Sequence, residues 1–167
     1  MESRTTAFAK LPAAPETHSP FCHVTIQLTT RQPTQFIDIT DRIQQVASDA
    51  GLPFAILNIQ TLHTTTAILV NEHEPLLLTD FEDVLEAAAP VFRRYRHDDA
   101  RLRTVNVTAD ERRNGHAHCR ALLLPSSACL NVTHGRLLLG TWQRVFFVEL
   151  DGPRERQLSV LVIGCAS

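Results

Sequence analysis

The sequence predicts a single α+β domain with a mainly antiparallel sheet core and about three helices. Several strand-like runs of alternating apolar and polar residues follow one another without a helix between them, which favours this class over a doubly wound sheet. The chain has 167 residues, the usual length of one domain. With 44% hydrophobic and 20% charged residues, its composition is that of an ordinary globular protein.

The domain is expected to begin after residue 20. Residues 1–20 hold three prolines among small and polar residues and show no apolar period, which predicts a loosely ordered extension. Residues 21–167 are expected to form the domain. Its first strands are expected over residues 22–28 and residues 36–39, where β-branched and apolar residues recur at strand spacing.

Two helices have clear start and stop signals. Thr40 is expected to cap a helix whose apolar residues share one face, and Gly51 is expected to end it. Pro75 fits the first turn of a second helix, because the amide hydrogen that proline lacks would be unbonded there. The apolar stripe of this second helix stops before Pro90.

Further strands are expected on both sides of the second helix. Residues 54–60 read as a buried strand, and residues 65–70 are expected to pair beside it. A short third helix is expected over residues 116–124. The last part of the chain alternates apolar segments with turns and predicts an antiparallel meander, with strands at 128–132, 136–139, 144–150 and 158–163.

The net charge of the chain indicates which kinds of molecule it is expected to bind. The formal net charge is -2, so no general basic excess favours nucleic acid, and no nucleic-acid partner is expected. One locally cationic stretch lies in a long connection of weak periodicity, and it is read either as a solvated loop or as an anion-binding rim. Its arginines are Arg93, Arg94, Arg96, Arg101, Arg103, Arg112 and Arg113.

The expected location is the cytoplasm. No apolar run reaches the ~18 residues that span a bilayer, and the start of the chain lacks the apolar core of a secretory signal, so no membrane partner is expected. The four cysteines are scattered without a paired motif and are interpreted as free thiols. Cys119, which follows His118, is interpreted as a small buried residue.

The most specific string is Gly140-Thr141-Trp142-Gln143. The single tryptophan beside an amide could stack and orient an aromatic ligand, or it could simply fill the core. Glu149 and Arg156 follow at spacings that suit either a binding site or a cross-strand ion pair that steadies the sheet.

Histidines from separate segments form the second candidate constellation. His63, His97 and His118 could converge on a metal ion or on a transferring proton. Each could instead be a packed, hydrogen-bonded residue, because spacing alone does not bring distant segments together. Asn71 and Glu72 lie at the far end of the strand that follows His63.

Taken together, these motifs resemble the YjbQ-like family. The matching strings are HTTTAILVNE (His63 to Glu72), YRHD (Tyr95 to Asp98), NGHAH (Asn114 to His118) and LLLGTWQ, followed by Glu149, DGPR and Arg156. The resemblance covers residues 21–164. It implies an α+β fold and a homotrimer with sites near subunit boundaries.

The resemblance also implies thiamine-phosphate synthase activity, a transferase step in thiamine biosynthesis. A thiazole phosphate would displace pyrophosphate from an aminopyrimidine-methyl pyrophosphate, so the expected partner is a small phosphorylated heterocycle. The alternative is a trimeric, non-catalytic protein that binds a small anion or a metal.

The residues carried over fall into three roles. Expected catalytic residues are His63, His97, His118, Glu72 and Gln143. Expected substrate-binding residues are Thr64, Thr65, Asn71, Thr141, Trp142, Glu149 and Arg156. The three histidines are also the expected ligands of a divalent metal, magnesium or zinc.

Overall fold

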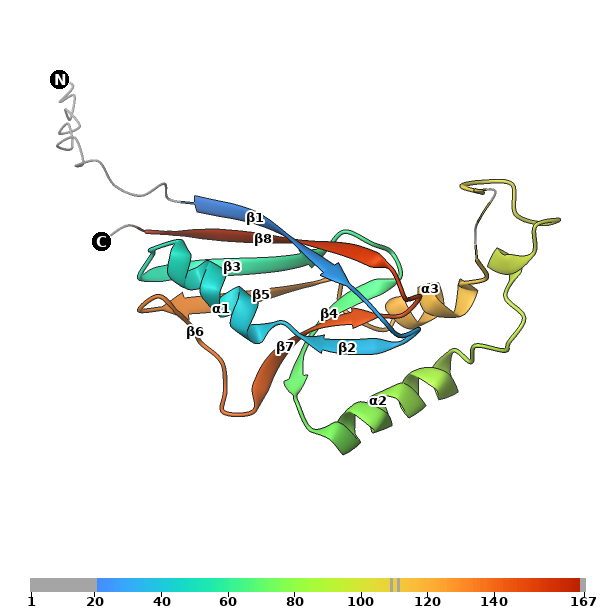
Figure 1. Ribbon diagram of the computed structural model, residues 1–167, viewed down its shortest axis with the longest axis horizontal. Helices are drawn as coiled ribbons and strands as arrows, with labels where there is room; N and C mark the ends of the chain where they lie inside the picture. Colours follow the sequence, from blue (N-terminus) through green and yellow to red (C-terminus); the bar gives the residue numbers. More distant parts are fainter. Residues whose placement is uncertain (1–20, 109, 111, 166–167) are drawn as a thin grey trace, which may run out of the picture.

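The structure is a computed structural model that describes residues 21–108, 110 and 112–165. The extension expected over residues 1–20 lies outside the described residues. Figure 1 shows two antiparallel sheets with three α-helices packed around them. The elements are β1 (Phe21–Thr29), β2 (Gln35–Asp38), α1 (Thr40–Asp49), β3 (Phe54–Thr61), β4 (Thr66–Glu72), α2 (Pro75–Ala88), the short 3-10 helix η1 (Arg96–Asp98), α3 (Gly115–Ala121), β5 (Ser127–Thr133), β6 (Arg136–Leu137), β7 (Gln143–Glu149) and β8 (Glu155–Cys165).

The larger sheet has five strands in the order β1-β8-β3-β5-β6, and all neighbours are antiparallel. β8 is the strand between β1 and β3, with Val160 opposite Val24 on one side and Ile59 on the other. Its inward residues are fully buried because both neighbours and α1 enclose them. The alternation predicted for residues 22–28 is confirmed in β1.

The smaller sheet has three strands in the order β2-β7-β4. Residues 145–148 of β7 are apolar on both faces and have no exposed surface. One face packs with α1 and the larger sheet, and the other packs with α2 and α3. A continuous apolar run of this kind requires a central strand covered on both sides.

Two predicted pairings are wrong. Residues 65–70 do not pair with β3, because β4 pairs with β7 in the other sheet. The C-terminal strands do not form a meander either: only β5 and β6 make a hairpin, whereas β7 joins β2 and β4 and β8 inserts between β1 and β3. In both cases the partner is chosen by two-sided burial and not by closeness in sequence.

The helices begin and end close to the predicted signals. Gly51, with a φ of 66°, follows the end of α1 as expected. Thr40, however, is the first residue of α1 and does not cap it: its hydroxyl donates to Asp38 Oδ1 at 2.6 Å and accepts from the backbone N–H of Val145 at 2.8 Å. Thr40 therefore joins α1 to β7.

The second helix is confirmed over Pro75–Ala88. Pro75 occupies its first turn, and the Glu74 carboxylate caps it by accepting from Leu76 N–H and Leu77 N–H at 3.0 and 2.8 Å. The short third helix is also confirmed, with α3 beginning at Gly115. The prediction of a buried Cys119 is wrong, because its side chain is exposed on this helix.

The two helices α2 and α3 cover one face of the smaller sheet, and the segment between them projects from the body of the molecule (Figure 1). The outward face of the larger sheet carries no helix in the described part of the chain. Among the described residues, no helix is long and apolar enough to cross a membrane.

Candidate functional site

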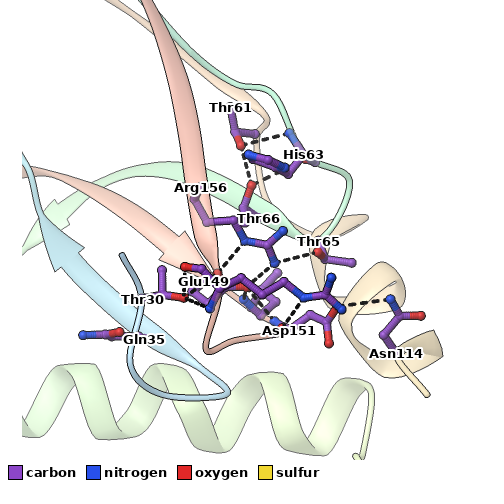
Figure 2. A network of polar contacts seen from close by, with 12 residues as sticks. Thr30, Gln35, Thr61, His63, Thr65, Thr66, Asn114, Glu149, Asp151 and Arg156 are labelled. Carbon is purple, nitrogen blue, oxygen red and sulfur yellow. Dashed lines mark hydrogen bonds and ion pairs between the residues drawn. The ribbon is translucent and has the colours of Figure 1, made fainter. Parts of the chain in front are cut away.

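The centre of the candidate site is an ion pair between Glu149 and Arg156. Arg156 Nη2 lies 2.6 Å from Glu149 Oε1, and Arg156 Nε lies 2.7 Å from Glu149 Oε2. The two side chains are 0% and 6% exposed. The predicted ion pair is confirmed, but it does not cross neighbouring strands of one sheet: β7 and β8 belong to different sheets, so the pair joins the two sheets (Figure 2).

Every remaining acceptor of the Glu149 carboxylate is occupied. Oε1 accepts from the backbone N–H groups of Leu150 and Asp151 at 3.0 and 2.8 Å, and Oε2 accepts from Thr30 Oγ1 at 3.0 Å. Burial acts to raise the pKa of Glu149, but the hydrogen bonds from Arg156 and the Asp151 amide outweigh burial and hold that pKa below its usual 4.5. The carboxylate is therefore ionised at neutral pH.

Thr65 completes the shell around Arg156. Its hydroxyl accepts from Arg156 Nη2 at 3.1 Å. Thr65 is thus a positioning residue for the guanidinium, whereas its neighbour Thr64 is exposed. The loop from Leu62 to Thr65 that carries both residues connects β3 in one sheet to β4 in the other.

A second carboxylate, that of Asp151, lies two residues after Glu149 and contacts half-exposed arginines. Asp151 Oδ2 lies 2.9 Å from Arg154 Nη2 and 3.1 Å from Asn114 Nδ2, and Arg112 Nη2 donates to the Asp151 carbonyl at 2.8 Å. These contacts fasten the chain before α3 to the turn between β7 and β8. Among the described residues, Asn114 Oδ1 is a buried acceptor without a hydrogen-bond partner.

The turn approaches a neighbouring loop closely at Gly152. A Cβ atom there would lie 2.3 Å from the carbonyl oxygen of Gln32, a distance that no side chain could adopt without moving the backbone. The Gly152 N–H donates to the Pro33 carbonyl at 3.1 Å. The DGPR string, read from sequence as an ordinary turn, therefore needs its glycine for packing.

His63 lies in the β3–β4 loop, above Arg156 in Figure 2. Its Nε2 accepts from the backbone N–H of Gln157 at 2.9 Å. Burial, followed by the positive charge of Arg156, lowers the pKa of His63 below its usual 6.5. The ring is neutral at pH 7 as a result.

The other two predicted histidines meet each other. The rings of His97, in η1, and His118, on α3, have centroids 4.6 Å apart, and His97 Nε2 lies 3.1 Å from Arg103 Nη1. In the described part of the chain, no three His, Cys, Asp or Glu side chains are placed to share a metal ion. One chain thus brings together two of the three histidines, and magnesium or zinc binding stays a prediction.

His63 does not suit metal ligation in this conformation. A ligand nitrogen must offer a lone pair, and the Nε2 lone pair already accepts the Gln157 N–H. The neutral ring consequently carries its hydrogen on Nδ1. This donor chemistry fits an anion and not a cation.

Two cavities flank the projecting segment, and the first is cationic. Its volume is about 300 Å³. The lining residues are His97, Asp98, Ala100, Arg103, Val107, Thr108, Arg112 and Arg113. Asp98 Oδ1 is already engaged, because it accepts from the backbone N–H groups of Asn114 and Gly115 at 3.1 and 2.9 Å.

The second cavity, of about 850 Å³, is lined largely by the same segment. It shares Asp98, Ala100 and Arg113 with the first. Its other lining residues are Val91, Phe92, Arg93, Arg94, Tyr95, Asp99, Arg101 and His116. Of the arginines noted in the sequence, all except Arg96 line one or both of these hollows.

The remaining predicted site residues lie at the opposite end of the smaller sheet. Glu72 is paired with Gln143, six positions along β4 from the pairing of Thr66 with Glu149, which corresponds to roughly 20 Å. Asn71 belongs to the same end as Glu72. Within one chain, the predicted residues thus form two groups and not one pocket.

Trp142 belongs to this distant group and is 71% exposed, so the interpretation of Trp142 as a core residue is wrong. Thr141 beside it is exposed as well. Gln143 Oε1 accepts from the backbone N–H of Gly140 at 2.8 Å and holds the turn between them. The indole remains available to another molecule.

Sequence reasoning missed a polar cluster near this end. The Asp38 carboxylate contacts Arg144 Nε at 2.8 Å and His73 Nδ1 at 2.9 Å, and it accepts from Thr40. Burial acts to raise the pKa of Asp38, but the hydrogen bonds from Thr40, Arg144 and His73 lower it to about 2. The three segments involved are far apart in sequence, so no local sequence pattern predicts the cluster.

Comparison with known proteins identifies the family. A profile described as "UPF0047 protein YjbQ-like" matches residues 24–165. A "UPF0047 protein" from Methanothermobacter thermautotrophicus is 40% identical over 139 residues, which are 83% of this chain and 90% of the relative. The chain belongs to the YjbQ-like family. The family resemblance seen in the motifs is confirmed.

Solved structures of similar proteins agree in fold. A solved "YbjQ-like protein of unknown function" from Sulfolobus solfataricus is 34% identical and covers 87% of this chain and 98% of its own, with a TM-score of 0.76. A "hypothetical protein" from Aeropyrum pernix is also 34% identical, covers 86% and 98%, and has a TM-score of 0.74. The predicted α+β class is confirmed.

The comparisons contradict the expected thiamine-phosphate synthase activity. The relatives carry only family names, and the Sulfolobus solfataricus structure is described as one of unknown function. None of these descriptions names that synthase, a transferase or any catalysis. The geometry of one chain also argues against that activity. Trp142, expected to stack on the heterocycle, and Arg156, expected to bind its phosphates, lie at opposite ends of the smaller sheet.

Substituting one partner of the central ion pair should lower the free energy of unfolding more than expected from substituting both partners. Glu149→Gln leaves the buried Arg156 charge without its partner, and we expect a loss of about 3–5 kcal/mol in the free energy of unfolding. Replacing both residues by methionine should cost less than the sum of Glu149→Met and Arg156→Met. Urea unfolding of the four variants measures both quantities.

The control is Asp41→Asn, which breaks an ion pair of Arg144 in which Asp41 is 90% exposed. Its cost should be about 1 kcal/mol or less. A Glu149→Gln cost no larger than that of Asp41→Asn would show that the buried pair does not hold the two sheets together.

Stability should fall as the solution is acidified below about pH 6.5. Burial, followed by Arg156 for His63 and Arg120 for His116, lowers the pKa of each histidine below 6.5. The unfolded chain then binds protons that the folded chain does not, so stability is complete above the unfolded pKa and is lost as pH falls toward the folded values. The melting temperature, measured from about pH 8 to about pH 5, should decrease.

In this series the variants His63→Gln and His116→Gln should flatten the decrease, whereas His134→Asn, at an exposed turn, should leave it unchanged. A melting temperature that rises over the same interval would contradict the assigned direction of the two pKa shifts.

Proposed function

We propose that this protein binds a small phosphorylated ligand in the cationic cavity beside η1. The observation that supports this proposal is the charge of the lining: three arginines face a single carboxylate, that of Asp98. Asp98 is engaged by backbone N–H groups and does not neutralise the arginines directly. A phosphate group offers the paired oxygens that guanidinium groups bind best.

Two of the three lining arginines, Arg103 and Arg112, are held in place before any ligand arrives. Arg103 donates from Nε to the Val105 carbonyl at 3.2 Å and from Nη2 to the Asn106 carbonyl at 2.5 Å. Arg112 is oriented by the Asp151 carbonyl. Donors that are oriented in advance lose less conformational entropy on binding, which favours affinity.

Size and net charge support a small ligand. A cavity of about 300 Å³ is at the lower end of the range of ligand sites. The whole chain has a formal net charge of -2, so its cationic character is local and suits one anion more than a polynucleotide.

The larger cavity offers room for the organic part of the ligand. Arg113 lines both cavities, so a phosphate near Arg113 could extend its substituent toward Tyr95 and Phe92. Phe92 is 99% exposed, and its ring is available for stacking. A phosphorylated heterocycle is the ligand class that suits both hollows.

Calorimetric titration with inorganic phosphate and with pyrophosphate tests the proposal. We expect saturable binding that weakens as salt is added, because the contacts are charged. Arg113→Gln should weaken binding about ten-fold, since it removes one charge-assisted contact. Arg112→Gln should weaken binding similarly.

Arg136→Gln is the matched control, because Arg136 is an exposed arginine on β6 and lines neither cavity. Binding of neither anion to the unmodified protein, or equal losses in Arg113→Gln and Arg136→Gln, would overturn the proposal.

We also propose that copies of this chain assemble through the outward face of the larger sheet, as the homotrimer implied by the family resemblance. The support is an apolar end of that face, where Phe54, Ile56 and Ile163 are each 54% exposed. Adjacent exposed apolar side chains of this kind mark interaction surfaces. Sites near subunit boundaries stay a prediction that depends on this assembly.

Light scattering coupled to gel filtration should return three times the mass of one chain. Ile56→Asp should shift the protein toward the monomer, because it places a charge in the apolar contact. Leu76→Asp is the control, since Leu76 is also an exposed apolar residue but lies on α2. A monomeric mass for the unmodified protein would contradict the proposed assembly.

A further inference from the structure

The larger cavity contains an imidazole that makes no hydrogen bond with the described residues. His116 lies on α3 and lines this cavity together with Tyr95 and Phe92. Its side chain is half-buried, and no described residue donates to either ring nitrogen or accepts from it. A neutral imidazole offers one N–H donor and one acceptor. Because a polar group that is partly withdrawn from water needs a partner, the ring is suited to contact the molecule that occupies the cavity.

Other polar side chains of this cavity are engaged with the protein. The Tyr95 hydroxyl donates its hydrogen to a backbone carbonyl at 2.8 Å. Asp99 Oδ2 lies 3.1 Å from Arg94 Nη2 and 3.0 Å from Arg101 Nη2, so these two arginines are directed toward a carboxylate. Among the described lining residues, His116 is the uncharged side chain that can still both donate to a ligand and accept from it.

The backbone of His116 is fixed before any ligand binds, because α3 is anchored near both ends. At its start, Asp98 Oδ1 accepts from the Gly115 N–H at 2.9 Å. Near its end, the buried Arg120 donates from Nε to the Ala89 carbonyl at 3.0 Å. A side chain carried by an anchored helix loses less conformational entropy when it meets a ligand, which favours affinity.

The start of α3 also packs directly against the segment that carries Tyr95. A Cβ atom at Gly115 would lie 2.5 Å from Tyr95 Cβ and 3.2 Å from Asp98 Oδ1, so only glycine permits this approach. His116 follows Gly115, and Arg113, which lines both cavities, lies two residues before it. The short segment of residues 113–116 therefore supplies both a cation shared with the smaller cavity and the imidazole of the larger one.

The imidazole is neutral at pH 7. Burial, followed by the positive charge of Arg120, lowers the pKa of His116 below its usual 6.5. The carboxylates of Asp151, Asp98 and Glu86 act to raise that pKa, but burial and Arg120 outweigh them. A neutral ring does not attract phosphate by charge. Its contribution is a directed hydrogen bond, which suits an uncharged polar group of the ligand.

We propose that His116 forms a hydrogen bond with the heterocycle of the bound phosphate ester and thereby determines which heterocycles the larger cavity accepts. This inference rests on the proposed phosphate-binding function and adds a specificity residue to it. The arginines of the smaller cavity hold the phosphate, and the heterocycle enters the cavity of about 850 Å³, a size within the range of ligand sites. The ligand class is a phosphate monoester whose heterocycle carries nitrogen or oxygen on its edge, as a nucleoside monophosphate does.

Calorimetric titration with ribose 5-phosphate and with adenosine 5′-monophosphate tests the inference, because the two share a phosphate and a sugar and only the second carries a heterocycle. We expect the unmodified protein to bind adenosine 5′-monophosphate about ten-fold more tightly than ribose 5-phosphate. His116→Phe keeps a ring but neither donates nor accepts, so it should remove this advantage and leave the affinity for ribose 5-phosphate unchanged. His116→Gln keeps a donor and an acceptor and should retain most of the advantage.

The matched control is His23→Phe, since His23 is an exposed histidine on β1 and lines neither cavity. It should leave both affinities unchanged. Equal affinity of the unmodified protein for the two compounds would overturn the inference, as would an unchanged affinity of His116→Phe for adenosine 5′-monophosphate. Equal losses for both compounds in His116→Phe would also overturn it, because they would show that the side chain acts only through the structure of the site.

Nitrogen-15 NMR of the unmodified protein gives a readout that does not depend on how a variant folds. The ring signals of His116 are assigned by their absence in His116→Gln. At a pH of about 7.5, adenosine 5′-monophosphate should shift these signals, whereas ribose 5-phosphate should leave them in place. Ring signals that do not move when adenosine 5′-monophosphate is saturating would contradict the proposed contact.

The failure of this inference is distinguishable from that of the proposed function. If the unmodified protein binds neither phosphate nor pyrophosphate, the proposed function fails and the role of His116 fails with it. If pyrophosphate binds and Arg112→Gln and Arg113→Gln weaken it, but adenosine 5′-monophosphate binds no more tightly than ribose 5-phosphate, the proposed function stands and the inference about His116 is wrong.

Discussion

The polar end of this protein depends on the buried ion pair of Glu149 and Arg156. Taking two charges out of water is costly, and the cost is offset only when the geometry is good and the remaining donors and acceptors are satisfied. Here the pair is bidentate, and Thr30, Thr65 and two backbone N–H groups complete it. Because its partners come from both sheets, the pair sets how the sheets meet.

The proposed binding surface is connected to this pair through residues that become less buried step by step. The same carboxylate that holds Arg156 binds the Asp151 amide, so the Asp151 side chain is directed toward the chain before α3. Asp151 in turn holds Arg154 and Arg112, which are half exposed. The cationic cavity is thus connected to the core by a continuous set of hydrogen bonds, and its charges are oriented by groups that do not themselves meet a ligand.

Sequence patterns located the elements better than they located the partners of those elements. The stripe of α2 and the alternation of β1 follow from local periodicity, and both were correctly predicted. The pairing of β4 with β7 was not, because a strand's neighbour is decided by which faces of the whole chain need covering. The fully apolar run at residues 145–148 was the one available sign of a central strand.

The sequence by itself determined the family and the fold class, because its motif residues occur in specific ordered strings and its apolar residues recur at helix and strand spacing. Only the tertiary structure decided that His97 meets His118 while Trp142 lies at the far end of the same sheet. It also decided that Nε2 of His63 is already bonded by Gln157, 94 positions away. Contacts between segments far apart in sequence set these outcomes, and a local sequence pattern does not specify a partner that is so many residues away.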